Sequence, residues 1–302
     1  MNALITGFTG FVGKNLIRYL KDSDISYVPL SREELVSGVF SKIDQSDSII
    51  HLAGKAHVME KISDPGLYYE INFEFTKKLF DAFISSDAKK IIFISSVKAS
   101  ADIVDGELTE SDVPNPQTHY GKSKLMAEEY IQNQTLPLGK SFFILRPCMI
   151  HGLGNKGNLN LLYKLIAKGI PYPLAAFENK RSFLSVQNLC FVIRELLERD
   201  DIPSGIYNVS DDEVLSTNTL IKLIAKASDR SPKLWKINPT LIRYIAKLGD
   251  ILKLPLTTER LDKLTENYIV DNTKIKQALG KDFPVNAHDG ILTTIQSFKK
   301  PN

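Results

Sequence analysis

The sequence has 302 residues, 43% of them hydrophobic and 24% charged, which is typical of a globular protein that buries its own core. A formal net charge of +3 is too small to indicate a nucleic-acid-binding protein. The two cysteines, Cys148 and Cys190, lack the spacing of a metal site or of a disulfide framework. The first residues do not resemble a secretion signal, and no apolar run approaches the roughly 20 residues of a membrane span. We therefore expect a cytoplasmic protein with reduced thiols, no nucleic-acid partner and no membrane span.

Short apolar runs alternate with amphipathic segments along the first half of the chain. Helical spacing of apolar residues is found between most of the runs, most clearly over residues 68–87. This alternation predicts an α/β fold of the doubly wound Rossmann type, with a mostly parallel sheet and helices on both faces. The runs that we expect to form strands cover residues 2–6, 26–30, 47–54, 88–96 and 140–147.

The pattern changes after residue 147. A strand running into a helix is expected over residues 182–198, another strand over 205–210, and mostly helix from 216 to 279. We therefore expect a first domain at residues 1–147 and a smaller, mostly helical region at 148–302. Segments near 181–212 are expected to return to the first domain.

Residues 239–255, "PTLIRYIAKLGDILKLP", predict a basic amphipathic helix. Such a helix can lie on a membrane surface. Packing of the apolar stripe on the rest of the protein is the usual arrangement, and we expect it here. The stripe comprises Leu241, Ile242, Ile245, Leu248 and Leu252.

Three glycines follow the first expected strand in "TGFTGFVG" and precede the first expected helix. Gly7 permits a tight turn, Gly10 allows a pyrophosphate to approach the backbone, and Gly13 allows close packing of helix and strand. The start of the helix then offers free N–H groups and a favourable dipole to the phosphates. This segment predicts nucleotide binding, although its spacing is GxxGxxG instead of GxGxxG.

The end of the second expected strand bears on the choice of dinucleotide. An acidic residue there would bind a ribose 2′-hydroxyl, but the sequence has Ser31 and Arg32. Because a guanidinium suits a 2′-phosphate, we favour NADP(H) over NAD(H). Glu33 and Glu34 follow at once, so a shift of one residue in the alignment would reverse this prediction.

Tyr120 and Lys124 lie four residues apart at the start of an expected helix, and therefore on one face. A phenol with a pKa near 10 is a poor base at neutral pH, and we expect the ammonium of Lys124 to favour the phenolate. Ser95 and Ser96 end the fourth expected strand, where ligands of open α/β sheets bind. Serine, tyrosine and lysine beside a nicotinamide would move a proton on and off an alcohol oxygen.

Over nearly its whole length the sequence resembles the extended short-chain dehydrogenases/reductases, in particular the nucleotide-sugar epimerase/dehydratase group. The resemblance implies the Rossmann fold, a nicotinamide cofactor, a UDP- or TDP-linked sugar as substrate, and a homodimer formed through the helices that hold Asn72 and Tyr120. It rests on the segments Thr6–Gly13, His51–Gly54, Asn72, "SS" at 95–96, Tyr120–Lys124, Leu145–Gly152, "KRSFLSVQNL" and "DNTKIKQALG".

The resemblance also implies a role for individual residues. Tyr120 would be the general acid/base, Ser96 instead of Ser95 the catalytic serine, and Lys124 a further contact to the nicotinamide ribose. Asn158 and Arg181 match positions that touch the nucleotide diphosphate, and the fork of an arginine suits phosphate. The other expected cofactor contacts are Gly7, Gly10, Phe11, Val12, Gly13, Ser31, Arg32, Ala53, Gly54, Asn72 and Pro147.

Two departures from the family pattern bear on the reaction. Dehydratases of this group carry Asp-Glu directly after the catalytic residue, whereas Val97 and Lys98 stand here, which argues against 4,6-dehydration. Many epimerases have asparagine where this chain has Met149. The segments "SSVKA", "GNLNLL" and "PYPLAAFENKRS" resemble most the reductases of UDP-4-keto-6-deoxy-N-acetylhexosamines, enzymes of bacterial surface-polysaccharide synthesis.

Three functions therefore remain open at this point. We expect a 4-ketoreductase, and Lys98 is expected to help position the sugar, although it equally suits a side chain that points to solvent. A UDP-sugar 4-epimerase with tightly bound NAD uses the same residues. A regulator that senses NADP(H) without catalysis is disfavoured, because Ser96, Tyr120 and Lys124 are all present. The histidines have no metal-ligand spacing, and no metal is expected.

Overall fold

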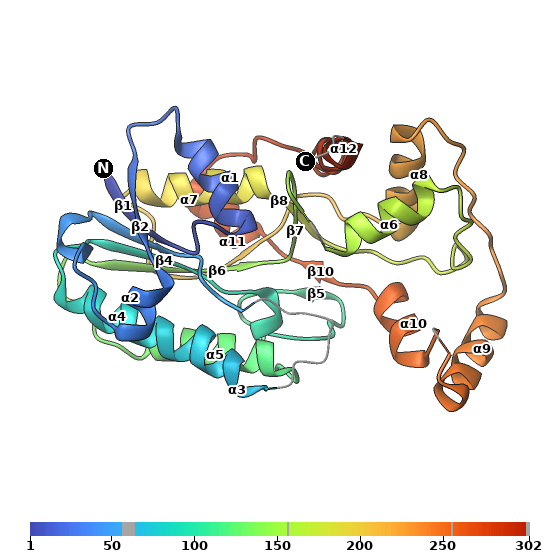
Figure 1. Ribbon diagram of the computed structural model, residues 1–302, viewed down its shortest axis with the longest axis horizontal. Coiled ribbons are helices and arrows are strands. Elements are labelled where there is room, and N and C mark those ends of the chain that lie inside the picture. Colours follow the sequence, from blue (N-terminus) through green and yellow to red (C-terminus); the bar gives the residue numbers. More distant parts are fainter. Residues whose placement is uncertain (56–63, 156, 255, 300–302) are drawn as a thin grey trace.

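A parallel β-sheet forms the centre of the molecule (Figure 1). The computed structural model describes residues 1–55, 64–155, 157–254 and 256–299, and within them six parallel strands lie in the order β2, β1, β3, β4, β6, β9. Because β2 and β3 lie on opposite sides of β1, the order changes direction there, which creates the crevice where such folds bind ligands. In chain order the strands are β1 (Asn2–Thr6), β2 (Ser26–Leu30), β3 (Ser48–His51), β4 (Lys90–Ile94), β6 (Ser141–Pro147) and β9 (Gly205–Val209).

Both faces of the sheet are covered by helices, as the sequence predicts. In β1, Ala3 and Ile5 belong to the core on one face and Leu4 to the core on the other, so the middle of the strand is apolar on both faces. The first face carries α1 (Phe11–Leu20), α7 (Val186–Glu198) and α11 (Thr273–Leu279). The second carries α2 (Arg32–Ser37), α3 (Gly66–Tyr69), α4 (Phe75–Ser85) and α5 (His119–Gln132).

Helices α4 and α5 lie side by side on the second face, where the hydroxyl of Tyr130 donates a hydrogen bond to Asp81. The homodimer expected through these helices stays a prediction. A π-helical turn, Glu70–Glu74, joins α3 to α4 and was not predicted from the apolar spacing. Short 3₁₀ turns cover Ile43–Gln45 and Val97–Ala99.

The later chain builds a separate apolar cluster beside the sheet, at the right of Figure 1. It contains α6 (Asn158–Ala167), α8 (Thr217–Ala227) and α12 (Ala287–Lys299), with α9 (Pro239–Leu252) and α10 (Thr258–Thr265) farther out. Two small parallel sheets link it to the first part of the chain. They are β7 (Met149–His151) with β8 (Phe183–Ser185), and β5 (Glu107–Leu108) with β10 (Ile269–Val270).

The predicted packing of the α9 stripe is wrong for most of its residues. Of the five apolar residues expected to be covered, only Ile242 is buried. The helix instead packs through its small residues Ala246 and Gly249, which lie on a neighbouring face. The larger side chains Leu241, Ile245, Leu248 and Leu252 are exposed. No helix among the described residues is long and apolar enough to cross a bilayer.

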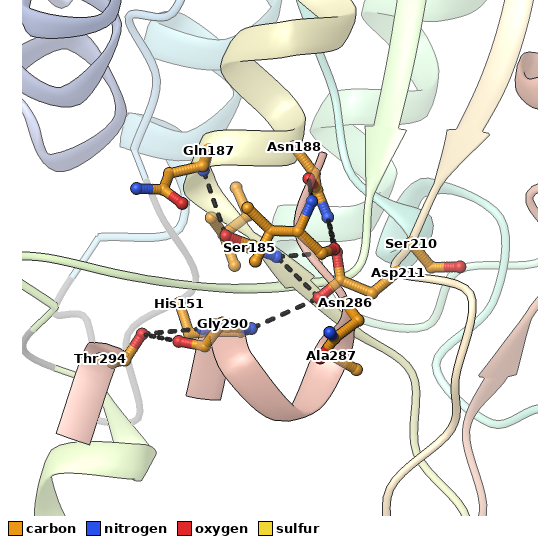
Figure 2. A network of polar contacts seen from close by, with 12 residues as sticks. His151, Ser185, Gln187, Asn188, Ser210, Asp211, Asn286, Ala287, Gly290 and Thr294 are labelled. Atoms are coloured by element: carbon orange, nitrogen blue, oxygen red, sulfur yellow. Dashed lines mark hydrogen bonds and ion pairs between the residues drawn. The ribbon is translucent and has the colours of Figure 1, made fainter. Parts of the chain in front are cut away.

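A buried carboxylate ties the C-terminal part of the chain to the sheet (Figure 2). Asp211 follows β9, and its two oxygens each accept the backbone N–H of Ser185 at 3.0 Å. Asn188 donates to the same carboxylate at 2.7 Å, while its amide also exchanges hydrogen bonds with the backbone of Val285. The segment before α12 is thereby fixed to α7 and to the end of β9.

Helix α12 has a second attachment within the same network (Figure 2). The hydroxyl of Thr294 donates to the carbonyl of Gly290 at 2.9 Å, so its oxygen is free to accept from Nδ1–H of His151 at 2.9 Å. The other ring nitrogen of His151 lies 3.6 Å from the Asp211 carboxylate. Strand β7, strand β8 and α12 are therefore held together around one buried polar cluster.

Candidate active site

The glycine turn forms a close-fitting cradle at the end of β1. Gly7 has a φ of +65°, and a Cβ on it would lie 2.7 Å from the backbone nitrogen of Ala53. A Cβ on Gly13 would lie 2.5 Å from the carbonyl oxygen of Gly7, so the helix can approach the turn only without a side chain there. Gly10 is the N-cap of α1, and no side chain among the described residues caps this helix start. An uncapped helix start of this kind offers its free N–H groups at residues 11–13, and the predicted contact with a diphosphate there stays a prediction.

The end of β2 places Ser31 and Arg32 beside this turn, because Leu30 pairs with Thr6. Ser31 is the N-cap of α2: its hydroxyl accepts from Glu34 N, and the Glu34 carboxylate accepts from Ser31 N at 2.8 Å. The carboxylate of Glu34 is thus engaged in the capping box of α2. Arg32 is exposed at the first position of the helix.

A chain of hydrogen bonds behind the cradle fixes His51 in one neutral form. Thr76 donates its hydroxyl to the carbonyl of Asn72 at 2.8 Å, so it accepts from Nε2–H of His51 at 3.0 Å. Nδ1 then accepts from the hydroxyl of Thr6 at 2.7 Å, and Thr6 accepts from Ala53 N at 3.0 Å. Burial, assisted by the charge of Lys124, lowers the pKa of His51 to about 3. The neutral ring therefore orders the backbone of Ala53.

Asn72 lies in the π-helical turn and is fully buried. Its amide nitrogen donates to the carbonyl of Lys55 and to the hydroxyl of Ser123, and its oxygen accepts from Lys55 N at 2.8 Å. The structure thus places Asn72 behind the crevice, where it joins the loop after β3 to α5. Its predicted contact with the cofactor stays a prediction.

The two serines after β4 have different surroundings. Ser95 donates its hydroxyl to the buried carboxylate of Glu128, which also pairs with Arg146 at 2.5 Å. The hydroxyl of Ser96 forms a hydrogen bond with that of Tyr120. The structure therefore brings together Ser96 and Tyr120, the pair that the resemblance implies, and gives Ser95 a structural partner that no signal in the sequence marked.

The pKa of Tyr120 is raised above its ordinary value of 10.0, mainly because of burial, although the hydrogen bond with Ser96 lowers it in part. This corrects the expected direction: burial outweighs the influences that favour the phenolate, and Lys124 is not among the main ones. Tyr120 as a whole residue remains partly exposed.

Lys124 lies one helical turn after Tyr120 and is buried. Its ammonium donates to the carbonyl of Ile94 at 2.8 Å, and a Cβ on Gly54 would come within 3.1 Å of it. Burial lowers the pKa of Lys124 to about 8, against the opposing effect of Glu128. Because Gly54 has no side chain, the ammonium of Lys124 can lie directly beside its backbone.

Lys98 and Arg181 both contact one tyrosine, Tyr268, that sequence reasoning missed. The ammonium of Lys98 lies 4.2 Å from the ring centroid of Tyr268 and donates to the carbonyl of Asp102 at 2.8 Å. The backbone of Arg181 pairs with that of Tyr268, and its guanidinium contacts Glu266 at 3.5 Å. Burial lowers the pKa of Lys98. Lys98 is therefore held along the protein surface instead of pointing to solvent.

Of the other expected site residues, Pro147 ends β6 and is buried at the carboxyl edge of the sheet. Asn158 is the first residue of α6, and its side chain lies outside what the structure describes. Met149 is 37% exposed in β7. Across residues 1–55, 64–155, 157–254 and 256–299, no three His, Cys, Asp or Glu side chains cluster as metal ligands.

Residues 3–210 match the model of the NAD dependent epimerase/dehydratase family. The chain belongs to this family. The match begins in β1 and ends just after β9, so it covers the whole central sheet.

Three relatives in this family bear on the reaction. The UDP-glucose 4-epimerase of Vibrio cholerae is 30% identical over 320 residues, 99% of this chain and 96% of that protein. The N-acetyl-alpha-D-glucosaminyl-diphospho-ditrans,octacis-undecaprenol 4-epimerase of Escherichia coli O157:H7 is 28% identical over 98% of this chain and 94% of its own length. The UDP-2-acetamido-2,6-beta-L-arabino-hexul-4-ose reductase of Pseudomonas aeruginosa is 31% identical over 53% of this chain and 38% of its own length.

Two solved structures share the fold of this chain. UDP-glucuronic acid 4-epimerase from Bacillus cereus in complex with NAD has a TM-score of 0.74 at 20% identity and covers 99% of both chains. RMD from Pseudomonas aeruginosa complexed with NADPH has a TM-score of 0.74 at 19% identity, with the same coverage. The protein is accordingly an NAD(P)-dependent enzyme of the epimerase and reductase type that acts on nucleotide-linked sugars.

Proposed function

We propose that the protein reduces the C4 ketone of a UDP-4-keto-6-deoxy-N-acetylhexosamine with NADPH. The observation that carries the proposal is the hydrogen-bonded pair of Ser96 and Tyr120, with a phenol whose pKa is raised. A phenol that keeps its proton at neutral pH is suited to donate it to a ketone oxygen. A reductase needs this protonated form at the start of each turnover.

In this reaction the chain supplies the proton and the positioning. Tyr120 donates its proton to the C4 oxygen, while Ser96 shares a hydrogen bond with that oxygen and with the phenol. The bound cofactor, when reduced, supplies the hydride. Lys124 carries its charge below a pH of about 8 and is held against the Ile94 carbonyl, which supports the contact with the nicotinamide ribose that the family resemblance implies.

The cofactor preference rests on the end of β2. Arg32 is exposed there beside the glycine cradle, and the capping box occupies the Glu34 carboxylate that would otherwise compete for a ribose hydroxyl. These contacts support NADP(H) over NAD(H), because a guanidinium pairs with a 2′-phosphate. We expect Arg32→Ala to raise the KM for NADPH by about 10-fold, the effect of one charge-assisted contact, and to leave the KM for NADH almost unchanged.

The substrate assignment rests on residues outside the cradle. The guanidinium of Arg181 retains N–H donors beyond those used by Glu266 and the Lys263 carbonyl, so it supports a contact with the UDP diphosphate, with Asn158 as a second. Lys98 is fixed near it and supports a contact with a sugar oxygen. Val97 is buried and apolar, which leaves no acid after Ser96 for elimination of water.

A UDP-sugar 4-epimerase with tightly bound NAD is the second candidate. It is favoured by the Vibrio cholerae relative, a UDP-glucose 4-epimerase that matches 99% of this chain at 30% identity. The same serine, tyrosine and lysine serve either reaction, since an epimerase removes and returns a proton at the same oxygen. The two candidates differ in whether the cofactor is consumed.

The deciding experiment mixes purified protein with NADPH and the UDP-4-keto sugar generated in situ, and follows the absorbance of the reduced nicotinamide. Consumption equal to product formation supports the reductase. Tyr120→Phe should lower kcat by about 10²–10⁴-fold, because the proton donor is lost. Tyr130→Phe, on the same helix, is the matched control and should keep normal activity. Absence of NADPH consumption, together with C4 inversion of UDP-N-acetylglucosamine or UDP-glucose, would replace the reductase by the epimerase.

A further inference from the structure

Helix α9 presents a continuous apolar stripe on the outside of the molecule. The stripe follows helical spacing over more than three turns, so all of its side chains share one face. Its most exposed members are Ile251 at 76%, Leu252 at 63% and Tyr244 at 62%. The complete stripe is Leu241, Tyr244, Ile245, Leu248, Ile251 and Leu252. A patch of this kind on an otherwise ordinary surface marks a site of interaction.

The outward direction of the stripe is fixed by the packing of the neighbouring face. Gly249 lies so close to the next segment that a Cβ there would be 1.9 Å from the carbonyl oxygen of Leu256. The carboxylate of Asp250 accepts from both the backbone N–H and the hydroxyl of Thr258, at 3.1 Å and 2.7 Å. Helix α9 is therefore attached to α10 through its small residues, and the large apolar side chains are left outside.

The chain segment that carries the stripe is basic. Residues 233–254 contain five lysines and arginines and one acid, while the whole chain has a net charge of only +3. The acid is Asp250, whose carboxylate accepts two hydrogen bonds from Thr258. Lys247 and Lys253 are exposed toward the C-terminal end of the helix. The stripe thus shares its segment with exposed positive charges, a combination that complements a surface that is apolar inside and negatively charged outside.

Two exposed aromatic side chains belong to the same stretch of the chain. Tyr244 belongs to the stripe, and Trp235, which is 56% exposed, lies in the segment that leads into α9. Tryptophan and tyrosine favour the boundary between lipid headgroups and acyl chains, because each has an apolar body and a polar tip. Leu254 adds a further exposed apolar side chain after the helix.

We propose that α9 docks on the surface of an anionic phospholipid bilayer, with the helix axis in the plane of the membrane and the stripe inserted at the headgroup boundary. A second copy of the chain fits this surface less well. The stripe follows a helix of 14 residues, about 21 Å long, and is smaller than a stable dimer interface needs. Two such surfaces facing each other would also bring their lysines together.

Docking through α9 would orient the proposed substrate region. Helix α10 packs against α9 and carries the Lys263 carbonyl that accepts from Arg181. In Figure 1, α9 and α10 form the end of the molecule opposite β1 and β2. A membrane-bound α9 therefore holds the Arg181 side of the crevice nearer to the bilayer than the glycine cradle. The docking itself does not depend on the proposed reaction.

Trp235 makes the test direct, because it is the single tryptophan of the chain. The full-length protein is mixed with phosphatidylcholine vesicles, with or without phosphatidylglycerol, and binding is followed by flotation and by tryptophan emission. We expect flotation and a blue shift only with the anionic vesicles, and a decline of both as salt rises. No flotation with either vesicle would overturn the proposal, as would equal binding to both.

Two variants distinguish vesicle binding through the stripe from non-specific binding of the protein to vesicles. Ile251→Glu combined with Leu252→Glu should reduce vesicle binding by at least about 10-fold and leave the sugar-nucleotide reaction in solution unchanged, since neither residue contacts the crevice. Ile103→Glu is the matched control: Ile103 is 77% exposed against 76% for Ile251, and its change should leave vesicle binding intact. Undiminished vesicle binding of the double variant would overturn the proposal. So would a wild-type dimer that the double variant makes monomeric, since the stripe would then be covered by a second copy.

Discussion

Ser95 and Ser96 are neighbours in the chain with unrelated tasks. Successive side chains at the end of a strand point to opposite sides, so one hydroxyl enters the core and the other faces the crevice. Ser95 completes the shell of a buried ion pair, and Ser96 is hydrogen-bonded to Tyr120. The sequence shows two identical residues here, and only the resemblance to the family separated them.

His51 is expected to make stability depend on pH. Its pKa is about 3 in the folded protein against 6.5 as an ordinary value, so the unfolded chain takes up a proton first as pH falls. Stability contributed by the neutral ring is therefore complete above a pH of about 6.5 and is lost progressively toward pH 3. By linkage the loss is about 1.4 kcal/mol per pH unit, or about 2 kcal/mol at pH 5.

Urea unfolding at several pH values checks this expectation. His51→Gln should unfold more easily at neutral pH but show a shallower decline of stability between about pH 6.5 and pH 5. His288→Gln serves as the control, because the His288 side chain is 49% exposed. Parallel pH curves for the wild type and His51→Gln would contradict the assignment.

At the level of elements, α5 carries the chemistry and its support on one face. Tyr120, Lys124 and Glu128 follow each other at intervals of four residues. Tyr120 faces the crevice, Lys124 binds the end of β4, and Glu128 lies in the core against Arg146. The helix start is fixed by Thr118, whose side chain caps Gly121 N.

Glu128→Gln is expected to destabilise the protein by about 3–5 kcal/mol, because Arg146 is 1% exposed and would keep a buried charge without its partner. The pKa of Lys124 should fall further, since the charge of Glu128 raises it. Thermal unfolding measures the first effect. Glu129→Gln, the next residue on the helix, is exposed and should change the melting temperature little. Equal effects of the two changes would refute a special role for the buried pair.

The strands and the glycine turn were predictable from sequence, since parallel strands buried on both faces read as plain apolar runs. Two features of the helices were not. The π-helical turn at Asn72 leaves the apolar spacing of Phe75, Leu79 and Phe83 intact, so periodicity gives no sign of it. The stripe of α9 has the periodicity of a packed helix, but the helix packs on the protein through Ala246 and Gly249. These residues are too small to stand out in a pattern of hydrophobic residues.

On the scale of the whole molecule, the C-terminal segment depends on one buried carboxylate. Asn188→Asp would place a second carboxylate against Asp211 and against the Val285 carbonyl. We expect a loss of about 3–5 kcal/mol from an uncompensated buried charge. Asp211→Asn in the same chain should restore part of it, because the swapped pair again has one acid and one amide. Thermal unfolding of the wild type, both single variants and the double variant completes a double-mutant cycle, which measures the coupling between the two side chains.

Failure of the double variant to exceed Asn188→Asp in stability would show that the two side chains do not act as a pair. The swap is not expected to restore all of the lost stability. The backbone N–H of Ser185 donates to both oxygens of the Asp211 carboxylate, and an amide at position 211 has only one acceptor oxygen. Thr294 and His151 still hold α12 in all three variants.

The candidate site was only partly predictable at this scale. The crevice residues follow strand ends, and the rule for open α/β sheets brings them together. Lys98 and Arg181 are 83 positions apart, and they meet through Tyr268, which lies 87 positions beyond Arg181. No periodicity marks that tyrosine, because it owes its place to the return of β10 beside β5.

The position of β9 in the sheet has a consequence for synthesis of the protein on the ribosome. The first 147 residues contain five of the six strands described in the central sheet, and β6 is the edge of that incomplete sheet. Its core residues Phe143, Ile144 and Leu145 and its unpaired backbone stay open until residues 205–209 emerge. An open apolar edge invites pairing with another nascent chain. Slow translation of the stretch between β6 and β9 should therefore lower the yield of soluble protein, and chaperones that shield strand edges should restore it.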